Sequence, residues 1–124
     1  MAAPSIRPDR AEIWQVNFSP QVGSEITKSR PAIVLDHGNS HLKVRIVVPI
    51  TAWRHERDEH NPFKIHMLPT LTNGLTKECA ADAYQIKTAA LERFEYKRGQ
   101  VSEEEADEVA EAVALAIDLP SLGS

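Results

Sequence analysis

An arginine and a threonine stand at the ends of two apolar segments of the chain. Arg30 directly precedes Pro31, which opens the apolar run 31–35, and Thr51 closes the run 47–50. Proline fixes its own φ angle and favours extended geometry in the residue before it, so we expect Arg30 at the mouth of a strand. If the two strands pair, the guanidinium and the hydroxyl converge on one spot. Two such hydrogen-bond donors suit a phosphodiester.

The elements that must position these residues follow from the alternation of apolar and polar side chains. This pattern predicts five strands, at residues 12–18, 31–35, 42–50, 63–67 and 81–86. Polar loops are expected at 19–29 and 52–62, and turns at 36–40 and 73–74. A short helix is expected at 88–94. Five short strands predict a small SH3-like barrel or a strongly bent antiparallel sheet.

A helix is predicted at the C-terminal end. Ser102 and Glu105 have the spacing of a capping box, and Pro120 ends the segment. An apolar stripe at helical spacing should cover the sheet; its members are Ala106, Val109, Val113, Ala116 and Ile117. The fold class is therefore mainly β with a C-terminal helix (α+β). We expect a loose leader at 1–10, a single domain at 11–119 and a tail at 120–124.

The distribution of charge matters more than its sum. The chain of 124 residues has a net charge of −4, but residues 99–124 carry seven acids and no Lys or Arg. The first 98 residues hold 14 basic and 11 acidic side chains, a balance of +3. A basic face that binds phosphates is compatible with this body. No signal peptide or membrane-spanning run is apparent, and the single Cys79 fits a packing residue in a reducing cytoplasm.

A series of short motifs, in this order, resembles the MazF/PemK family of toxin endoribonucleases. The motifs are Phe18-Ser19-Pro20, Gly23-Ser24-Glu25, Arg30-Pro31, Ile50-Thr51 and Tyr84-Gln85-Ile86-Lys87-Thr88. The resemblance runs from about Glu12 to Ile117. It implies a type II toxin with a CcdB/MazF/PemK-like fold that cleaves single-stranded RNA at a short sequence. It also implies a homodimer, an antitoxin with an acidic disordered tail, and products with a 2′,3′-cyclic phosphate or 3′-phosphate and a 5′-hydroxyl.

The same resemblance assigns roles to individual residues. The family's two catalytic residues fall on Arg30 and Thr51. The alternatives from sequence alone are a surface arginine paired with Glu25 or Asp36, and a β-branched residue that merely ends a strand. Supporting or RNA-binding roles are expected for Ser24, Glu25, Lys28, Trp53, Gln85 and Lys87. Trp53 is a candidate for stacking on a base, with core packing as the alternative.

Metal chemistry is not expected. The five histidines lack the spacing of a metal site, and His37 and His41 are separated by a turn. His55 and His60, in the charged loop, could assist RNA binding. We therefore expect a metal-independent enzyme without a cofactor. The rival hypotheses are a CcdB-like toxin that binds DNA gyrase without cutting, and a degenerate relative that only binds RNA or antitoxin.

Overall fold

The computed structural model describes residues 6–19, 28–37 and 41–120. Their strands form one antiparallel sheet with the order β4-β5-β3-β2-β1-β7, to which β6 is added by pairing with β3. The strands are β1 (Glu12–Asn17), β2 (Ser29–Val34), β3 (Val44–Ala52), β4 (Lys64–Met67), β5 (Cys79–Asp82), β6 (Lys87–Ala90) and β7 (Phe94–Gln100). Among these strands β4 and β7 are the two ends of the path, so the sheet is bent but not closed. The predicted fold class is confirmed.

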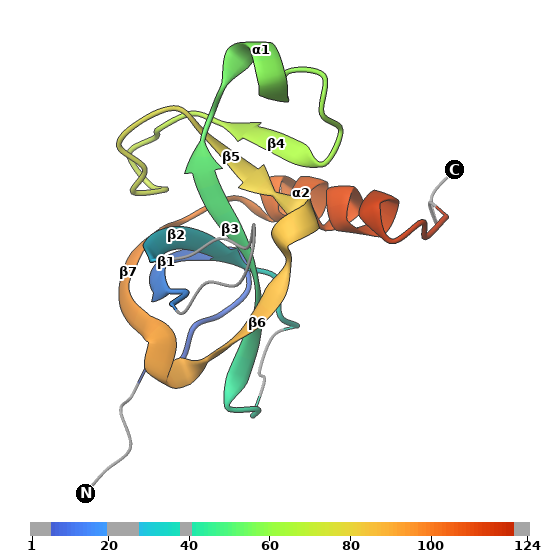
Figure 1. The fold of residues 1–124 in the computed structure, drawn as a ribbon. Helices are drawn as coiled ribbons and strands as arrows, with labels where there is room; N and C mark the ends of the chain where they lie inside the picture. The colour runs from blue at the N-terminus through green and yellow to red at the C-terminus, as the bar shows by residue number, and fades with distance from the viewer. Residues whose placement is uncertain (1–5, 20–27, 38–40, 121–124) are drawn as a thin grey trace, which may run out of the picture.

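The nine-residue strand β3 is the central strand of this sheet and pairs with three others. Its first part pairs with β6 and its middle with β2, whereas Ile50–Ala52 pairs with β5. The sheet therefore splits at the end of β3: in Figure 1, β4 and β5 lie above the curved layer formed by β1, β2 and β7. Thr51 lies in this part of β3. Beyond Pro49 strand β3 pairs with β5 and not with β2, so the end of β3 and the start of β2 are not joined by sheet pairing.

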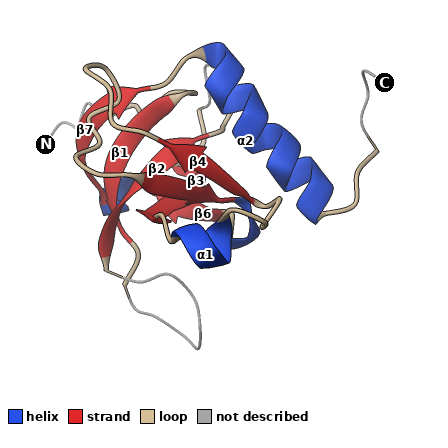
Figure 2. Cartoon of the chain, turned by 90° about the horizontal axis from the view of Figure 1, so that it is seen from above, coloured by secondary structure: helices blue, strands red, loops and turns tan. Residues whose placement is uncertain are grey.

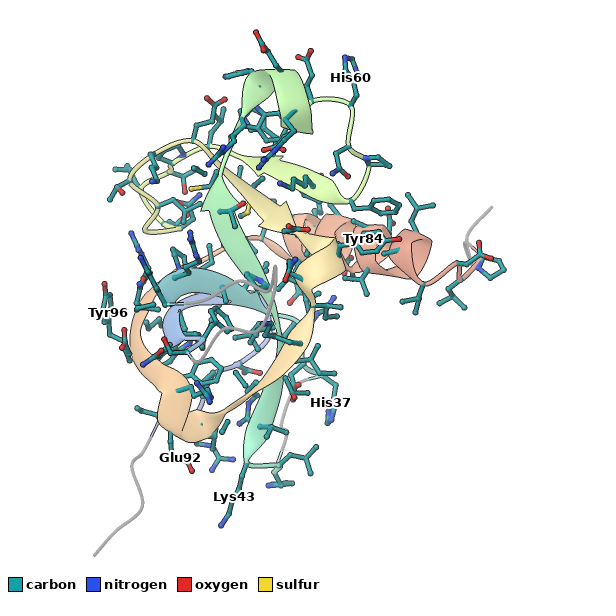
Figure 3. All side chains as sticks on the ribbon, in the orientation of Figure 1. His37, Lys43, His60, Tyr84, Glu92 and Tyr96 are labelled. Carbon is teal, nitrogen blue, oxygen red and sulfur yellow. The ribbon has the colours of Figure 1, made fainter. Side chains whose placement is uncertain are left out.

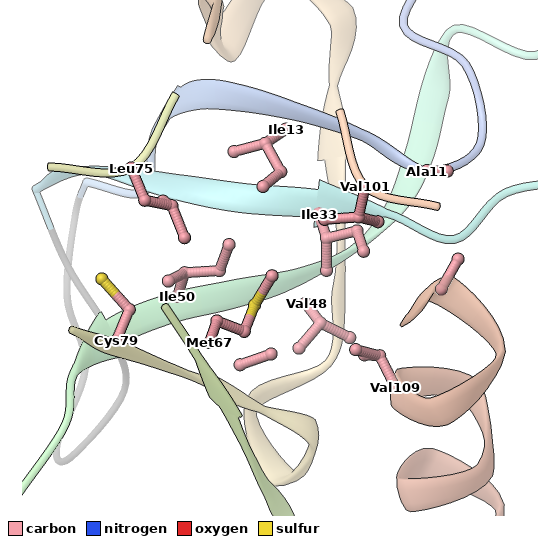
Figure 4. Close-up of a cluster of buried hydrophobic side chains, with 12 residues drawn as sticks. Ala11, Ile13, Ile33, Val48, Ile50, Met67, Leu75, Cys79, Val101 and Val109 are labelled. Atoms are coloured by element: carbon pink, nitrogen blue, oxygen red, sulfur yellow. The ribbon is translucent and has the colours of Figure 1, made fainter. Parts of the chain in front are cut away.

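Side chains alternate between two buried clusters on opposite faces of the strands. One cluster contains Ile13, Ile33, Val48 and Ile50, and Figure 4 shows Val109 reaching it from the C-terminal helix. The other cluster is built around Trp14, Val16, Phe18, Val34, Val47 and Phe94. Trp14 meets Phe94 edge to face, with ring centroids 5.8 Å apart. Burial on both faces fixes the register of the central strands, because a slip by one residue would exchange the two faces.

The helix α2 (Glu103–Ala116) begins as predicted. Ser102 is the N-cap, and its hydroxyl accepts a hydrogen bond from the Glu105 N–H at 3.1 Å in a capping box. The helix runs along one side of the sheet (Figure 2) and packs against β4 and the 3₁₀ turn η1 (Ala83–Gln85). Its buried residues are Ala106, Val109 and Ala112. The prediction for Ile117 is wrong: this residue lies at the C-cap and is exposed.

Three other expectations about secondary structure are wrong. Residues 88–94 do not form an α-helix, because Lys87–Ala90 pairs with β3 and the 3₁₀ turn η2 (Leu91–Arg93) follows. The strand expected at 81–86 ends at Asp82, where the Asp82 side chain caps η1 by accepting from the Tyr84 N–H. The loop 52–62 contains a one-turn helix, α1 (His55–Asp58). Pairing with β3 overrides the helix propensity of Ala89 and Ala90.

Candidate active site

A cleft of about 230 Å³ opens where the start of β2 meets the end of β3. Its polar lining residues are Ser29, Arg30, Thr51, Thr76, Lys77 and Arg98. Its apolar lining residues are Pro31, Ile50, Ala52, Leu75 and Cys79. Among the lining residues that the structure describes, three are cations and none is an acid. Such a lining attracts a phosphate group.

Arg30 and Thr51 reach the cleft from neighbouring ends of two strands. At this end β2 and β3 pair as far as Ala32 and Pro49, and Arg30 and Thr51 each lie two residues beyond that pair. Residues two apart in a strand lie on the same face, so each has the face of the paired residue that it follows or precedes. Both line the cleft, as expected from the sequence. Their catalytic roles remain predictions.

The hydroxyl of Thr51 is buried yet makes no hydrogen bond. Within the described part of the chain, Thr51 Oγ1 is the buried side-chain polar atom that has no partner. A buried hydroxyl without a partner is destabilising, and such atoms in native proteins often mark a functional position. Because Thr51 also lines the cleft, a turn of its side chain would let this hydroxyl donate to a ligand there.

Arg98 and Lys77 are cleft cations that the sequence did not reveal. The Arg98 Nε and Nη2 donate to the Gly74 carbonyl at 3.2 and 2.9 Å, and Nη1 donates to Gln15 Oε1 at 2.9 Å. Gly74 has φ +70°, and a Cβ there would lie 2.1 Å from the Arg98 carbonyl oxygen. Only glycine permits this approach, which holds the loop against β7. Arg98 and Lys77 are brought to the cleft by the fold, and the sequence around each contains no motif that would have indicated a site.

A chain of hydrogen bonds across three strands fixes the start of β2. Gln15 Nε2 donates to Ser29 Oγ at 2.8 Å, and Ser29 Oγ donates to Glu95 Oε1 at 2.5 Å. Gln15 also accepts from Arg98, so the chain links β7, β1 and β2. Ser29 directly precedes Arg30 in β2. The network therefore restrains the backbone from which the Arg30 side chain enters the cleft.

Beyond the end of β3, Trp53 belongs to a cluster of rings around one carboxylate. The Trp53 ring stacks on His66 with centroids 4.1 Å apart, and its indole N–H donates to His55 Nδ1 at 3.2 Å. Glu78 binds both imidazoles, at 3.1 Å from His55 Nε2 and 2.5 Å from His66 Nε2. The hydrogen bond from His66, helped by that from His55, lowers the pKa of Glu78 despite partial desolvation. Sequence reasoning found Trp53 and His55 but missed His66 and Glu78, which lie on β4 and just before β5.

The loop that carries these rings is anchored by a buried carboxylate. Asp58, whose side chain is fully buried, accepts from the Arg54 N–H at 2.9 Å and from Lys64 Nζ at 3.1 Å. Burial by itself raises the pKa of Asp58, but these hydrogen bonds and the nearby Lys64 and Arg57 charges lower it overall. The polar loop expected at 52–62 is thus tied to β4 at this point.

The other residues with predicted roles lie outside the cleft lining. The Lys87 ammonium lies 5.2 Å from the centroid of the Phe18 ring, and Gln85 ends η1. Lys28 is exposed and has a positive φ of 66°. Ser24 and Glu25 fall outside the described residues. The fold therefore brings Arg30 and Thr51 together but does not place Lys28, Gln85 or Lys87 on the same cleft wall.

The described residues offer no site for a metal ion. They contain no group of three or more His, Cys, Asp or Glu side chains arranged to hold one. Cys79 lines the cleft, but burial raises the pKa of its thiol, so this side chain is suited to packing rather than to nucleophilic attack. No helix in the described segments has the length and apolarity to cross a membrane.

Comparison with known proteins identifies the class to which this fold and cleft belong. Residues 9–117 match the family described as PemK-like, MazF-like toxin of type II toxin-antitoxin system. The chain belongs to this family, and the family predicted from the sequence is confirmed.

Individual relatives agree with this assignment. The chain is 36% identical over 117 residues to Endoribonuclease MazF9 of Mycobacterium tuberculosis (strain ATCC 25618 / H37Rv), covering 89% of this chain and 96% of the relative. Its fold is similar to MazF of Deinococcus radiodurans, with a TM-score of 0.72, 22% identity and coverage of 90% and 97% of the two chains. It is also similar to a mycobacterial endoribonuclease in complex with its cognate antitoxin, with a TM-score of 0.71, 20% identity and coverage of 93% and 99%.

Proposed function

We propose that this toxin is a metal-independent endoribonuclease that cleaves single-stranded RNA at a short sequence. The observation that carries the proposal is the convergence of Arg30 and Thr51 on a cleft whose described lining has three cations and no acid. The curated relative that is 36% identical is named an endoribonuclease, which favours cleavage over a purely binding function. Family membership likewise disfavours the CcdB-like alternative.

In the proposed reaction the ribose 2′-oxygen attacks the adjacent phosphorus and the bond from phosphorus to O5′ breaks. The 2′-hydroxyl proton leaves to a base and the O5′ leaving group takes up a proton. The products are a 2′,3′-cyclic phosphate, which water can open to a 3′-phosphate, and a 5′-hydroxyl. Negative charge develops on the phosphoryl oxygens, and the fixed guanidinium of Arg30 stabilises it.

Thr51 has a different role in this proposal. A neutral hydroxyl is a weak base, but it is a good donor to a phosphoryl oxygen. Because Oγ1 is buried and unpaired, RNA binding would satisfy it without breaking an existing hydrogen bond. Lys77 and Arg98 add phosphate contacts along the cleft. Glu25 is our candidate for the group near the 2′-hydroxyl, on the basis of its motif alone.

The proposal extends to partners and context. A homodimer that acts on cytoplasmic RNA and is inhibited by a cognate antitoxin follows from the family resemblance. The solved structure of a related endoribonuclease with its cognate antitoxin supports the antitoxin as a partner. An acidic antitoxin segment and an RNA phosphate would both be attracted to the cationic cleft, so the two ligands should compete. Residues 11–119 form the toxin domain, with a leader at 1–10 and a tail at 120–124.

Incubating the purified chain with a long single-stranded RNA in excess EDTA tests the function. We expect cleavage at a few sites and new ends that polynucleotide kinase labels without prior phosphatase treatment, which identifies 5′-hydroxyls. Arg30→Ala protein with an unchanged circular dichroism spectrum is the control for contaminating nucleases. Intact RNA after incubation with folded wild-type protein, or activity that EDTA removes and Mg²⁺ restores, would overturn the proposal.

A further inference from the structure

The ring cluster of Trp53, His55, His66 and Glu78 lies at the rim of the proposed active-site cleft. Trp53 follows Thr51 by two residues, and its backbone N–H donates to the Glu78 carbonyl at 3.2 Å. The neighbours of Glu78 in the chain, Lys77 and Cys79, both line the cleft. The end of β3 and the segment before β5 therefore carry the cleft wall and the ring cluster together.

Hydrogen bonds give the cluster a defined geometry. The indole N–H of Trp53 can only donate, so His55 Nδ1 is the acceptor and His55 Nε2 carries the proton that is donated to Glu78. His66 Nε2 donates to the other oxygen of the same carboxylate. Glu78 thus holds one ring that stacks on Trp53 and one that meets it edge to face, with an interplanar angle of 87° for the latter.

The cluster is held in place but remains accessible. The exposed fraction of the side chain is 69% for His55, 39% for His66 and 35% for Glu78, and Trp53 is half-buried. Aromatic groups in hydrophobic cores are normally covered by other apolar side chains. These rings are instead fixed by a carboxylate at the surface, beside a cleft lined with cations. Proteins that bind single-stranded RNA stack its bases on rigid, solvent-exposed aromatic side chains next to the groups that bind phosphate.

We infer that Glu78 is a positioning residue that fixes Trp53 and His66 as a stacking platform for the RNA base next to the cleaved phosphate. The inference rests on the proposed endoribonuclease function. Glu78 touches neither the phosphate nor the reacting atoms; it orients both imidazoles and, through them, the indole. The platform contributes to RNA binding and not to the chemical step. Its loss should raise KM and leave kcat nearly unchanged.

The test uses a short RNA that contains one cleavage site mapped on long RNA, and the same RNA with single abasic nucleotides beside that site. For the wild type, removing the stacked base should raise KM about tenfold, since stacking on an aromatic side chain is worth about 1–3 kcal/mol per base. Trp53→Leu and Glu78→Ala should raise KM by a similar factor on intact RNA, with kcat within threefold. Both variants should then be insensitive to the abasic substitution, whereas Trp53→Phe should recover much of the affinity.

His41→Ala is the matched control. His41 is an exposed histidine two residues before Lys43, and Lys43 lies at the opposite end of the molecule from the loop that carries His60 (Figure 3). We expect the KM of this variant to equal that of the wild type. A second readout does not depend on turnover: in a Trp14→Phe background Trp53 is the sole tryptophan, and RNA binding should quench its fluorescence, less so with the abasic RNA.

The outcomes separate this inference from the proposed function. If the wild type cleaves no RNA, the proposed function fails. If the wild type cleaves but Trp53→Leu has an unchanged KM, or responds to the abasic RNA as the wild type does, the platform is refuted. If Glu78→Ala retains the wild-type KM, or changes kcat alone, Glu78 does not position the platform. Should Glu78→Ala fail to fold, His66→Leu removes the stacked partner instead and is judged by the same KM criterion.

Discussion

Thr51→Val should make the protein more stable and a poorer nuclease. The hydroxyl of Thr51 is buried and without a partner, and an unsatisfied buried polar group costs about 1–3 kcal/mol. Valine has nearly the same shape and the same preference for extended backbone. The substitution therefore removes the desolvation cost and creates no cavity. We expect the free energy of unfolding to rise by about 1 kcal/mol.

A gain of this size is measurable in a chain of this length. A change of 1 kcal/mol corresponds to a shift in Tm of about 4 °C for a domain between 100 and 150 residues. In the same variant the single-turnover cleavage rate should fall about 100-fold, because one donor to the developing negative charge is lost. The opposite directions of the two effects are the signature of a group kept for function at the expense of stability.

Urea unfolding followed by circular dichroism measures the first effect, and single-turnover cleavage of a labelled RNA measures the second. Thr88→Val is the matched control, because Thr88 also lies in a strand but is exposed; its stability should change by less than about 0.5 kcal/mol. A less stable Thr51→Val protein would mean that the hydroxyl has a structural partner. A wild-type cleavage rate would remove Thr51 from the mechanism.

Two further predictions concern charges outside the cleft. Asp58→Asn should cost about 3 kcal/mol, because Lys64, whose side chain is only 12% exposed, loses its counter-ion. Since the pKa of Asp58 is lowered in the folded state, this stabilisation is present above the ordinary carboxyl pKa of about 4 and is lost as pH falls through the folded pKa. Urea unfolding should therefore show the difference from wild type shrinking below about pH 4. Replacing Glu104, Glu108 and Glu111 with Gln should change RNA affinity less than threefold at physiological salt, because none of them lines the cleft and charges beyond about 8 Å are screened. RNA binding more than tenfold tighter in filter-binding assays would place α2 beside the RNA.

The central strands could be predicted because their sequence signals are strong. Strand β3 contains the continuous apolar run 47–50, Pro31 sets the start of the apolar part of β2, and Ser102 with Glu105 sets the start of α2. Strand β7 gave no such signal, since Phe94 is its one buried residue and the others are exposed or half-exposed. Its pairing with β1 contains two register shifts, which disrupt the regular alternation of inward and outward side chains.

The candidate site was predictable only where it depends on local sequence. Arg30 and Thr51 stand at strand ends that the sequence defines, so their approach follows once two adjacent strands pair. Arg98 comes from an unpredicted strand, and its side chain is aimed by the Gly74 carbonyl across a loop. Glu78 meets two histidines from different elements. Such contacts between distant segments depend on how the sheet splits at the end of β3. The local sequence pattern does not predict this split.

Single-turnover cleavage by Arg30→Ala and Arg30→Lys proteins tests the proposed mechanism most directly. The cleft should still bind RNA in both variants through Lys77 and Arg98. Alanine removes the charge, so cleavage should fall at least about 100-fold. Lysine keeps the charge without the planar fork and should recover only part of the rate. An Arg30→Ala protein with unchanged circular dichroism that cleaves within threefold of the wild-type rate would contradict the assignment of Arg30 as the catalytic residue.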